Sequence, residues 1–127
     1  MSQRDRARAI IDSEFEFVRQ TALTPEAVSR AALDAAEHSK SLRGSIKNLG
    51  GKIGDDGTHL SSFALSGPGG FVQVMDFVVV AEPLQSGGSK VALRVGDFLF
   101  QKGALGTKPT INGKPVISKF VQLLQSA

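Results

Sequence analysis

The chain has 127 residues, 41% of them hydrophobic, with a formal net charge of +3 and no cysteine, tryptophan or tyrosine. This length suffices for one domain with a hydrophobic core, and the missing cysteines exclude disulfides and thiolate chemistry. No apolar run approaches the roughly 20 residues of a membrane-spanning helix, and the charged N-terminus lacks a signal-peptide core. We therefore expect a cytoplasmic protein with no membrane span.

The positive charge is unevenly spread, because residues 1–37 hold five basic and seven acidic residues and the remainder hold ten and five. The basic residues are scattered singly, without the arginine clusters or aromatic–basic interleaving of nucleic-acid-binding surfaces. We interpret them as a solvated surface and do not expect a nucleic-acid partner.

The N-terminal segment has more than one interpretation. Residues 2–12 are rich in charge and could form a mobile arm or one or two helical turns. Ile11 and Phe15 share a helical face, so a longer helix is an alternative. We prefer a strand over about residues 14–22, because Phe15 and Phe17 alternate with glutamates.

A helix start follows directly. Thr24 suits an N-cap, Pro25 the first helical position, and Glu26 the positive end of the helix dipole. The pattern predicts a helix that ends at about His38 or Ser39, with a stripe of alanines facing inward.

Two strands should follow this helix. Residues 42–53 mix aliphatic residues with glycines and lysines, which indicates an irregular or edge strand. Residues 54–57 form a turn signal. In the next predicted strand, residues 58–66, Phe63 and Leu65 lie on one face.

The longest apolar run covers residues 71–81 and follows a glycine-rich turn. Its valines favour a strand over a buried helix, and it ends at Glu82-Pro83, where the proline removes a backbone donor. Because both faces are apolar, the strand should be covered on both sides or border a cavity.

Residues 90–101 should form its hairpin partner across a turn at residues 86–89. One extra residue at Gly96-Asp97, a β-bulge, puts the apolar residues of this strand on one face. That face would oppose Met75, Phe77, Val79 and Ala81, and we take it as the main core.

After a glycine-bearing loop at residues 103–113, Pro115 should open a helix that ends at about Gln125, with a broad apolar stripe. The fold class is therefore α+β: a curled antiparallel sheet of about four to six strands. A helix from the N-terminal half and the C-terminal helix should pack on one face, within a single domain.

Two stretches carry a family resemblance. FEFVRQTALTPEAVSRAALDAAEHS runs from a strand into a capped helix, and FVQVMDFVVVAEP with SKVALRVGDFLFQ forms a meander. This layout resembles the START/Bet v 1-like superfamily, also called SRPBCC or helix-grip. The chain departs from that family in its length, in a C-terminal helix of only about a dozen residues, and in a missing strand. The resemblance implies a cavity between sheet and helix for an apolar small molecule or lipid.

Few residues suggest a site. Asp76 interrupts a valine face, where desolvation would raise its pKa, although a solvated carboxylate is the simpler interpretation. Arg94 should lie near Val80, diagonal to Glu82, and could bind a ligand carboxylate or form a cross-strand salt bridge. The candidate ligand-binding set is Asp76, Arg94, Met75, Phe77, Phe98 and Phe120.

Other chemistry is not indicated. His38 should fall at a helix C-terminus and His59 after a turn, and neither has metal-ligand spacing to a carboxylate. The glycine-rich loops do not match a phosphate-binding loop, and no nucleophile motif is present. We expect no metal and no cofactor.

Three functions remain open. The first is a non-catalytic domain that binds an apolar small molecule or lipid between sheet and helix. The second is a homodimeric interaction or structural protein, because long apolar strands in a small chain leave a face to cover. The third is an enzyme that uses Asp76.

Overall fold

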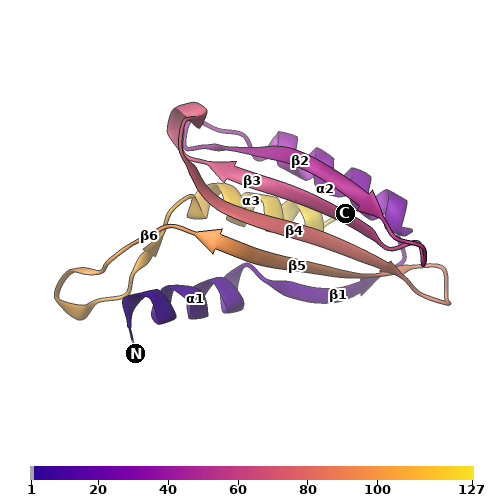
Figure 1. The fold of residues 1–127 in the computed structure, drawn as a ribbon, viewed down its shortest axis with the longest axis horizontal. Coiled ribbons are helices and arrows are strands. Elements are labelled where there is room, and N and C mark those ends of the chain that lie inside the picture. Colours follow the sequence, from indigo (N-terminus) through magenta and orange to yellow (C-terminus); the bar gives the residue numbers. More distant parts are fainter. Residues whose placement is uncertain (1) are drawn as a thin grey trace.

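A computed structural model describes residues 2–127 as three α-helices and two antiparallel sheets (Figure 1). The helices are α1 (Gln3–Glu14), α2 (Pro25–His38) and α3 (Lys114–Gln125). The strands are β1 (Phe17–Thr21), β2 (Ser45–Ile53), β3 (His59–Ser66), β4 (Gln73–Pro83), β5 (Ser89–Phe98), β6 (Phe100–Gln101) and β7 (Thr110–Ile111). Two 3-10 turns cover Pro68–Gly70 and Ala104–Gly106.

The main sheet has five strands in the order β1-β5-β4-β3-β2, and it is not closed. Because β1 and β2 form opposite edges, α2, which lies between them in the chain, crosses the width of the sheet. Both α2 and α3 cover the same face, while the other face is open (Figure 1). The predicted α+β class, with an antiparallel sheet and helices on one face, is confirmed.

The N-terminal segment is a helix. Ser2 caps α1 by accepting a hydrogen bond from the Asp5 N–H (3.0 Å), and Ala7, Ile10 and Ile11 are buried along one side. Residues 3–14 therefore pack against the rest of the protein and do not form the mobile arm that was one interpretation of the sequence. The strand predicted from residue 14 begins only at Phe17, because the residues before it complete the helix and its cap.

The β4–β5 hairpin contains the predicted bulge. Phe77 pairs with Val95 and Met75 with Phe98, so two residues of β5 oppose one residue of β4. All four side chains are buried, which confirms the predicted core face. Gly96 lies within the bulge, where a Cβ atom would collide with the opposing side chain.

The limits of β4 differ from the prediction. The strand covers Gln73–Pro83, two residues later than expected at each end, and Phe71 is 92% exposed. The Gly67 N–H donates to the Val72 carbonyl (2.9 Å), which closes a loop and holds Phe71 outside the sheet. The predicted loop at residues 103–113 also contains β7, whose Ile111 is buried opposite Phe100.

The two sheet-covering helices match their sequence signals. Thr24 caps α2 by accepting from the Ala27 N–H (3.2 Å), and Pro25 is its first residue, as predicted. Helix α3 begins one residue before Pro115 and ends at Gln125. Its predicted apolar stripe is buried at Val116, Ile117, Phe120, Val121 and Leu124.

Three aromatic rings form the centre of the core. Phe63 of β3 and Phe77 of β4 stack with their centroids 5.3 Å apart. Phe120 of α3 packs against both, at 5.5 Å from Phe63 and 5.0 Å from Phe77. This trio joins the final helix to the middle of the sheet.

Candidate functional site

The four apolar residues of the predicted ligand set lie in the core. Met75, Phe77, Phe98 and Phe120 are each at most 5% exposed. The trio of Phe63, Phe77 and Phe120 fills the space between the centre of the sheet and α3. A binding site for these four residues would therefore require the core to open.

The two charged residues of the set lie on the other side of the sheet. Asp76 alternates with the buried residues of β4, and its Oδ2 accepts a hydrogen bond from the Asp97 N–H (3.3 Å). Arg94 is exposed. Its partner in the register is Val78 and not the expected Val80. The sheet thus separates the charged candidates from the apolar ones.

The expected contact between Arg94 and Glu82 does not form. The register places Lys90, not Arg94, opposite Glu82. The prediction was wrong here because the chain turns at residues 84–88, between the paired Pro83 and Ser89, and not at residues 86–89.

Neither histidine is a buried core residue. His38 is the last residue of α2, as predicted, and its Nδ1 lies 2.8 Å from the Asp34 carbonyl oxygen and 3.4 Å from Oδ1 of the same residue. The hydrogen bond to the Asp34 carbonyl, together with the nearby carboxylate, raises the pKa of the exposed His38 ring. His59 is the first residue of β3.

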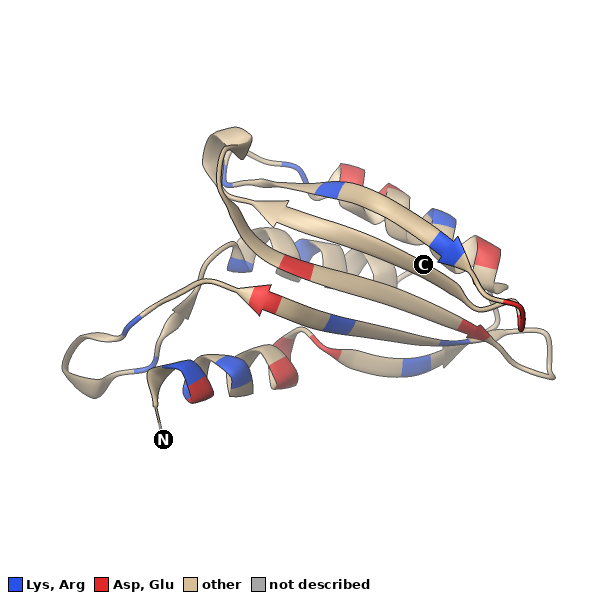
Figure 2. Cartoon of the chain, viewed as in Figure 1, with Lys and Arg blue, Asp and Glu red and all other residues tan. Residues whose placement is uncertain are grey.

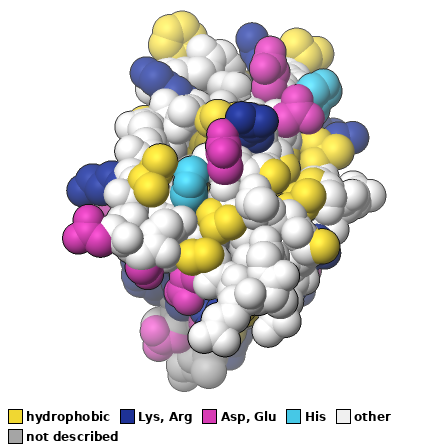
Figure 3. Space-filling model, turned by 90° about the vertical axis from the view of Figure 1, so that its right-hand side faces the viewer, with side chains coloured by type: hydrophobic (Ala, Val, Ile, Leu, Met, Phe, Trp, Pro, Cys, Tyr) yellow, Lys and Arg dark blue, Asp and Glu magenta, His cyan; other side chains and the backbone are white. Residues whose placement is uncertain are grey.

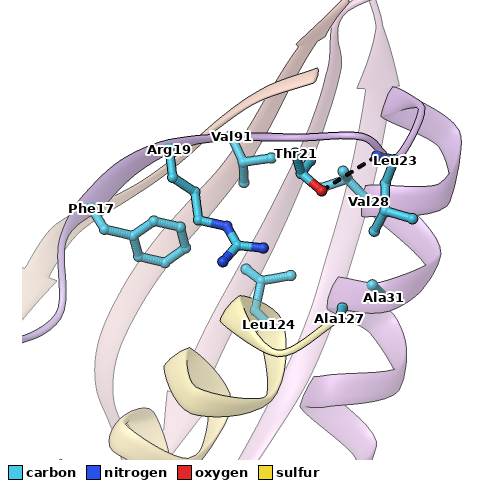
Figure 4. Close-up of a pocket in the computed structure, with 9 residues that line it drawn as sticks. All are labelled: Phe17, Arg19, Thr21, Leu23, Val28, Ala31, Val91, Leu124 and Ala127. Atoms are coloured by element: carbon cyan, nitrogen blue, oxygen red, sulfur yellow. Dashed lines mark hydrogen bonds between the residues drawn. The ribbon is translucent and has the colours of Figure 1, made fainter. Parts of the chain in front are cut away.

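A small pocket lies where β1, α2 and the end of α3 meet (Figure 4). Its walls come from Phe17 on β1, Val91 on β5, Val28 on α2 and Leu124 on α3, and its volume is about 10 Å³. The side chain of Arg19 points into it from β1, between the strand and the last turn of α3 (Figure 4). The pocket therefore combines apolar walls with one cationic group.

Arg19 faces inward because of its position in the strand. Burial alternates along β1, so Phe17, Arg19 and Thr21 lie on the helix-covered side and Val18 on the open side. Thr21 is held by accepting a hydrogen bond from the Leu23 N–H (3.3 Å). Sequence reasoning missed Arg19, although its phase with Phe17 is a signal that it could have used.

Arg19 forms no ion pair among the residues that the structure describes, although Ala127, whose terminal carboxylate is anionic, also lines its pocket. Five ion pairs form within residues 2–127, and none includes Arg19. Arg19 is half-buried as a residue, and its guanidinium makes no hydrogen bond to a described side chain or backbone group. A cation in such surroundings is well placed to pair with a carboxylate or phosphate.

A larger groove continues from this pocket. It lies between α2 and α3, has a volume of about 470 Å³ and shares Ala31 and Ala127 with the pocket. Leu123 contributes an apolar wall and Lys119 a second cationic group, while Asp34 beside His38 adds an anionic one. Its volume falls within the range of small-molecule sites.

The end of the molecule with the β2–β3 and β4–β5 turns has a different character. Charged side chains of both signs surround hydrophobic ones there (Figure 3). Like the scattered charge in the sequence, this mixed surface is typical of a solvated protein face.

Comparisons with known proteins assign the chain to no family. No family model matches the chain, and no curated protein matches it. Within residues 2–127, no helix is both long and apolar enough to cross a membrane. In the same range, no group of three or more His, Asp or Glu side chains is placed to hold a metal ion.

Proposed function

We propose that this protein is a small non-catalytic binding domain for an amphipathic molecule that carries an anionic group. Its site would be the Arg19 pocket and the adjoining groove between α2 and α3. One observation carries the proposal: Arg19 is a half-buried residue whose side chain points between apolar walls (Figure 4), and no described acidic side chain forms an ion pair with it.

The energetics favour an anion at this position. A cation that is partly removed from water loses hydration, and a carboxylate or phosphate that accepts from its guanidinium fork restores that loss. Arginine suits this task because its planar fork binds such groups through two parallel hydrogen bonds.

The dimensions place the ligand at the edge of the core. The pocket at Arg19 holds about 10 Å³, room for a single water or one oxygen of an anion. The rest of the ligand would lie in the groove of about 470 Å³, against Leu123 and the alanines of α2. The START/Bet v 1-like resemblance implies a cavity between sheet and helix, whereas the groove proposed here lies between the two helices that cover the sheet.

The test is a binding titration with two probes of equal chain length, decanoate and 1-decanol, followed by amide chemical shifts. We expect decanoate to shift Thr21, Leu124 and Ala127 and 1-decanol to bind more weakly. Arg19→Gln should weaken decanoate by about tenfold to a hundredfold, the value of hydrogen bonds to a charged group.

Arg94→Gln is the matched control, because Arg94 lies on the open face of the sheet. It should leave decanoate binding unchanged. Equal binding to wild type and Arg19→Gln, or shifts centred on the open face, would refute the proposal. Native mass spectrometry of protein from its own host would identify a retained ligand.

A homodimeric interaction protein is the second candidate. One register row on the open face is apolar across four strands, and consists of Val18, Ala92, Val80 and Leu60. Val18 is 47% exposed, and the other three are partly exposed. A dimer in sedimentation that Val80→Lys dissociates would support this function, whereas a monomer at high concentration would exclude it.

A further inference from the structure

The outer edge of β2 is open to another strand. β2 has β3 as its only neighbour in the sheet, and every residue from Lys47 to Ile53 is exposed. The Gly54 N–H donates to the Thr58 carbonyl (2.9 Å) next to the turn. Hydrogen-bonded and non-hydrogen-bonded pairs alternate along an antiparallel hairpin. Gly51 and Ile53 therefore direct their backbone N–H and C=O groups away from β3, in the plane of the sheet, where an added strand would lie.

A β-bulge in β2 changes the face of the sheet on which its side chains lie. The register with β3 shifts between Asn48 and Gly50, so the positions on either side of Leu49 change phase. As a result Ile46 and Ile53 both lie on the helix-covered side, opposite Leu65 and His59. The same shift places Lys47 and Lys52 together on the open face, opposite Ala64 and Leu60.

Helix α2 forms a wall along the same edge. Its turns extend past the outer edge of β2 (Figure 1). Two hollows separate helix and strand. One of about 400 Å³ has Leu33, Ala36 and Ile46 as apolar walls, and one of about 280 Å³ lies between Ser29 and Ile53. Each hollow also has one acidic and one basic residue of α2 or its end in its lining, Glu37 with Lys40 and Glu26 with Arg30. A strand added to β2 would lay its inward side chains over these hollows.

The charge of β2 indicates which kind of strand would pair with it. β2 carries two lysines and no acidic residue (Figure 2). A neighbouring strand that alternates apolar and acidic residues would place the apolar ones over the hollows and the acidic ones beside Lys47 and Lys52. Such cross-strand pairs of opposite charge are favourable.

The same lysines act against a second copy of the chain. The segment IKNLGGKI reads as a near-palindrome around Leu49 and Gly50. Antiparallel pairing of two copies that matches Ile46 with Ile53 would also place Lys47 opposite Lys52 twice, which is repulsive. This register of self-pairing is therefore disfavoured, whereas an acidic strand would place opposite charges beside the same lysines.

We propose that β2 and α2 bind an extended peptide segment of alternating apolar and acidic residues as a sixth strand of the sheet. This is strand addition, in which backbone hydrogen bonds supply affinity and side-chain hollows supply selectivity. The surface is distinct from the Arg19 pocket and does not depend on it.

The test uses a capped peptide of alternating valine and glutamate, with its valine–lysine counterpart and a version N-methylated at alternate residues. The acidic peptide should bind saturably and slow amide exchange at Gly51 and Ile53. The lysine peptide should bind far more weakly. N-methylation should abolish binding, because it removes the strand's donors while it keeps the side chains.

Variants make the test specific. The double variant Lys47→Glu with Lys52→Glu should weaken the acidic peptide by about tenfold and improve the lysine peptide, since two cross-strand pairs change sign. Lys90→Glu, on the open face of β5, is the matched control and should leave binding unchanged. All of these positions are exposed, so folding should be retained.

Three results would overturn the proposal. They are absence of acidic-peptide binding at about 1 mM, the weak limit of useful affinity, equal binding of the N-methylated peptide, and amide protection at Gly51 and Ile53 by dimers of the protein alone.

Discussion

Arg8 in α1 and Glu16 just before β1 form an ion pair, with Nη2 2.8 Å from Oε2, at the point where β1 leaves the edge of β5. The same Glu16 oxygen accepts from the Val95 N–H (2.8 Å), and Arg8 Nη1 donates to the Val95 carbonyl (2.9 Å). These side chains satisfy the backbone groups of β5 that a longer β1 would have bonded. They explain why the first strand can begin as late as Phe17.

We predict that Glu16→Ala lowers the free energy of unfolding by about 1–3 kcal/mol, because the Val95 N–H and Arg8 both lose their acceptor. Urea unfolding of the two proteins measures the difference. Arg30→Ala is the control, since its pair with Glu26 (2.7 Å) is exposed and should contribute less than about 1 kcal/mol. Equal losses in both variants would show that Glu16 has no special role.

The aromatic trio gives a second prediction. Phe77 is 1% exposed and packs against Phe63 and Phe120. Phe77→Ala should therefore cost about 3–5 kcal/mol in the free energy of unfolding. Phe71→Ala should leave thermal stability nearly unchanged, because Phe71 is 92% exposed. Normal stability of the Phe77 variant would contradict the core described here.

Gly96 gives a third prediction. A Cβ atom at this position would collide with Oδ1 of Asp76 on the facing strand. Gly96→Ala should destabilise the protein by at most about 1 kcal/mol, because the end of the partly exposed Asp76 side chain can turn away, and adding Asp76→Ala should recover part of that loss. Gly67→Ala is the control, since its Cβ would meet only Val74 at an ordinary 3.8 Å. The unfolding curves of wild type, Gly96→Ala, Asp76→Ala and the double variant form a double-mutant cycle, and a coupling energy of zero would show that the two positions do not interact.

The fourth prediction concerns pH. The Asp34 carbonyl and carboxylate raise the pKa of His38 above its ordinary value of 6.5. A raised folded-state pKa means that the protonated ring stabilises the fold, and that this contribution is complete below pH 6.5 and lost as pH rises through the folded value. Proton NMR titration of the His38 ring measures this pKa directly.

Asp34→Asn separates the two causes. It removes the carboxylate but keeps the backbone carbonyl, so the His38 pKa should fall and still lie above its ordinary value. A pKa that does not change in this variant would show that the carboxylate has no influence.

Much of the fold could be predicted from local signals. The Thr24 cap, the phase of Phe63 and Leu65, and the bulge at Gly96 each depend on residues within a few positions of one another. The candidate site could be predicted less well from the sequence. Asp76 and Arg94 stood out as charges in apolar strands, yet the sheet places them on the face away from Phe77 and Phe120.

The residue that carries the proposed site, Arg19, has an unremarkable sequence context. Its alternation with Phe17 indicates an inward face, but not which elements meet there. The pocket requires Val28 and Leu124, which are brought to β1 by α2 and α3.

The sequence by itself determined α2, α3, the cap of α2 and the buried faces of β3, β4 and β5, but not α1 or β7. Periodicity and capping could predict the first group because they are properties of neighbouring residues. Only the tertiary structure decided that β1 pairs with β5 rather than with β2, leaving β2 as a free edge and Arg19 beside α3. Strand order depends on contacts between residues such as Phe17 and Leu93, distant in the chain, and alternation is the same whichever partner a strand takes.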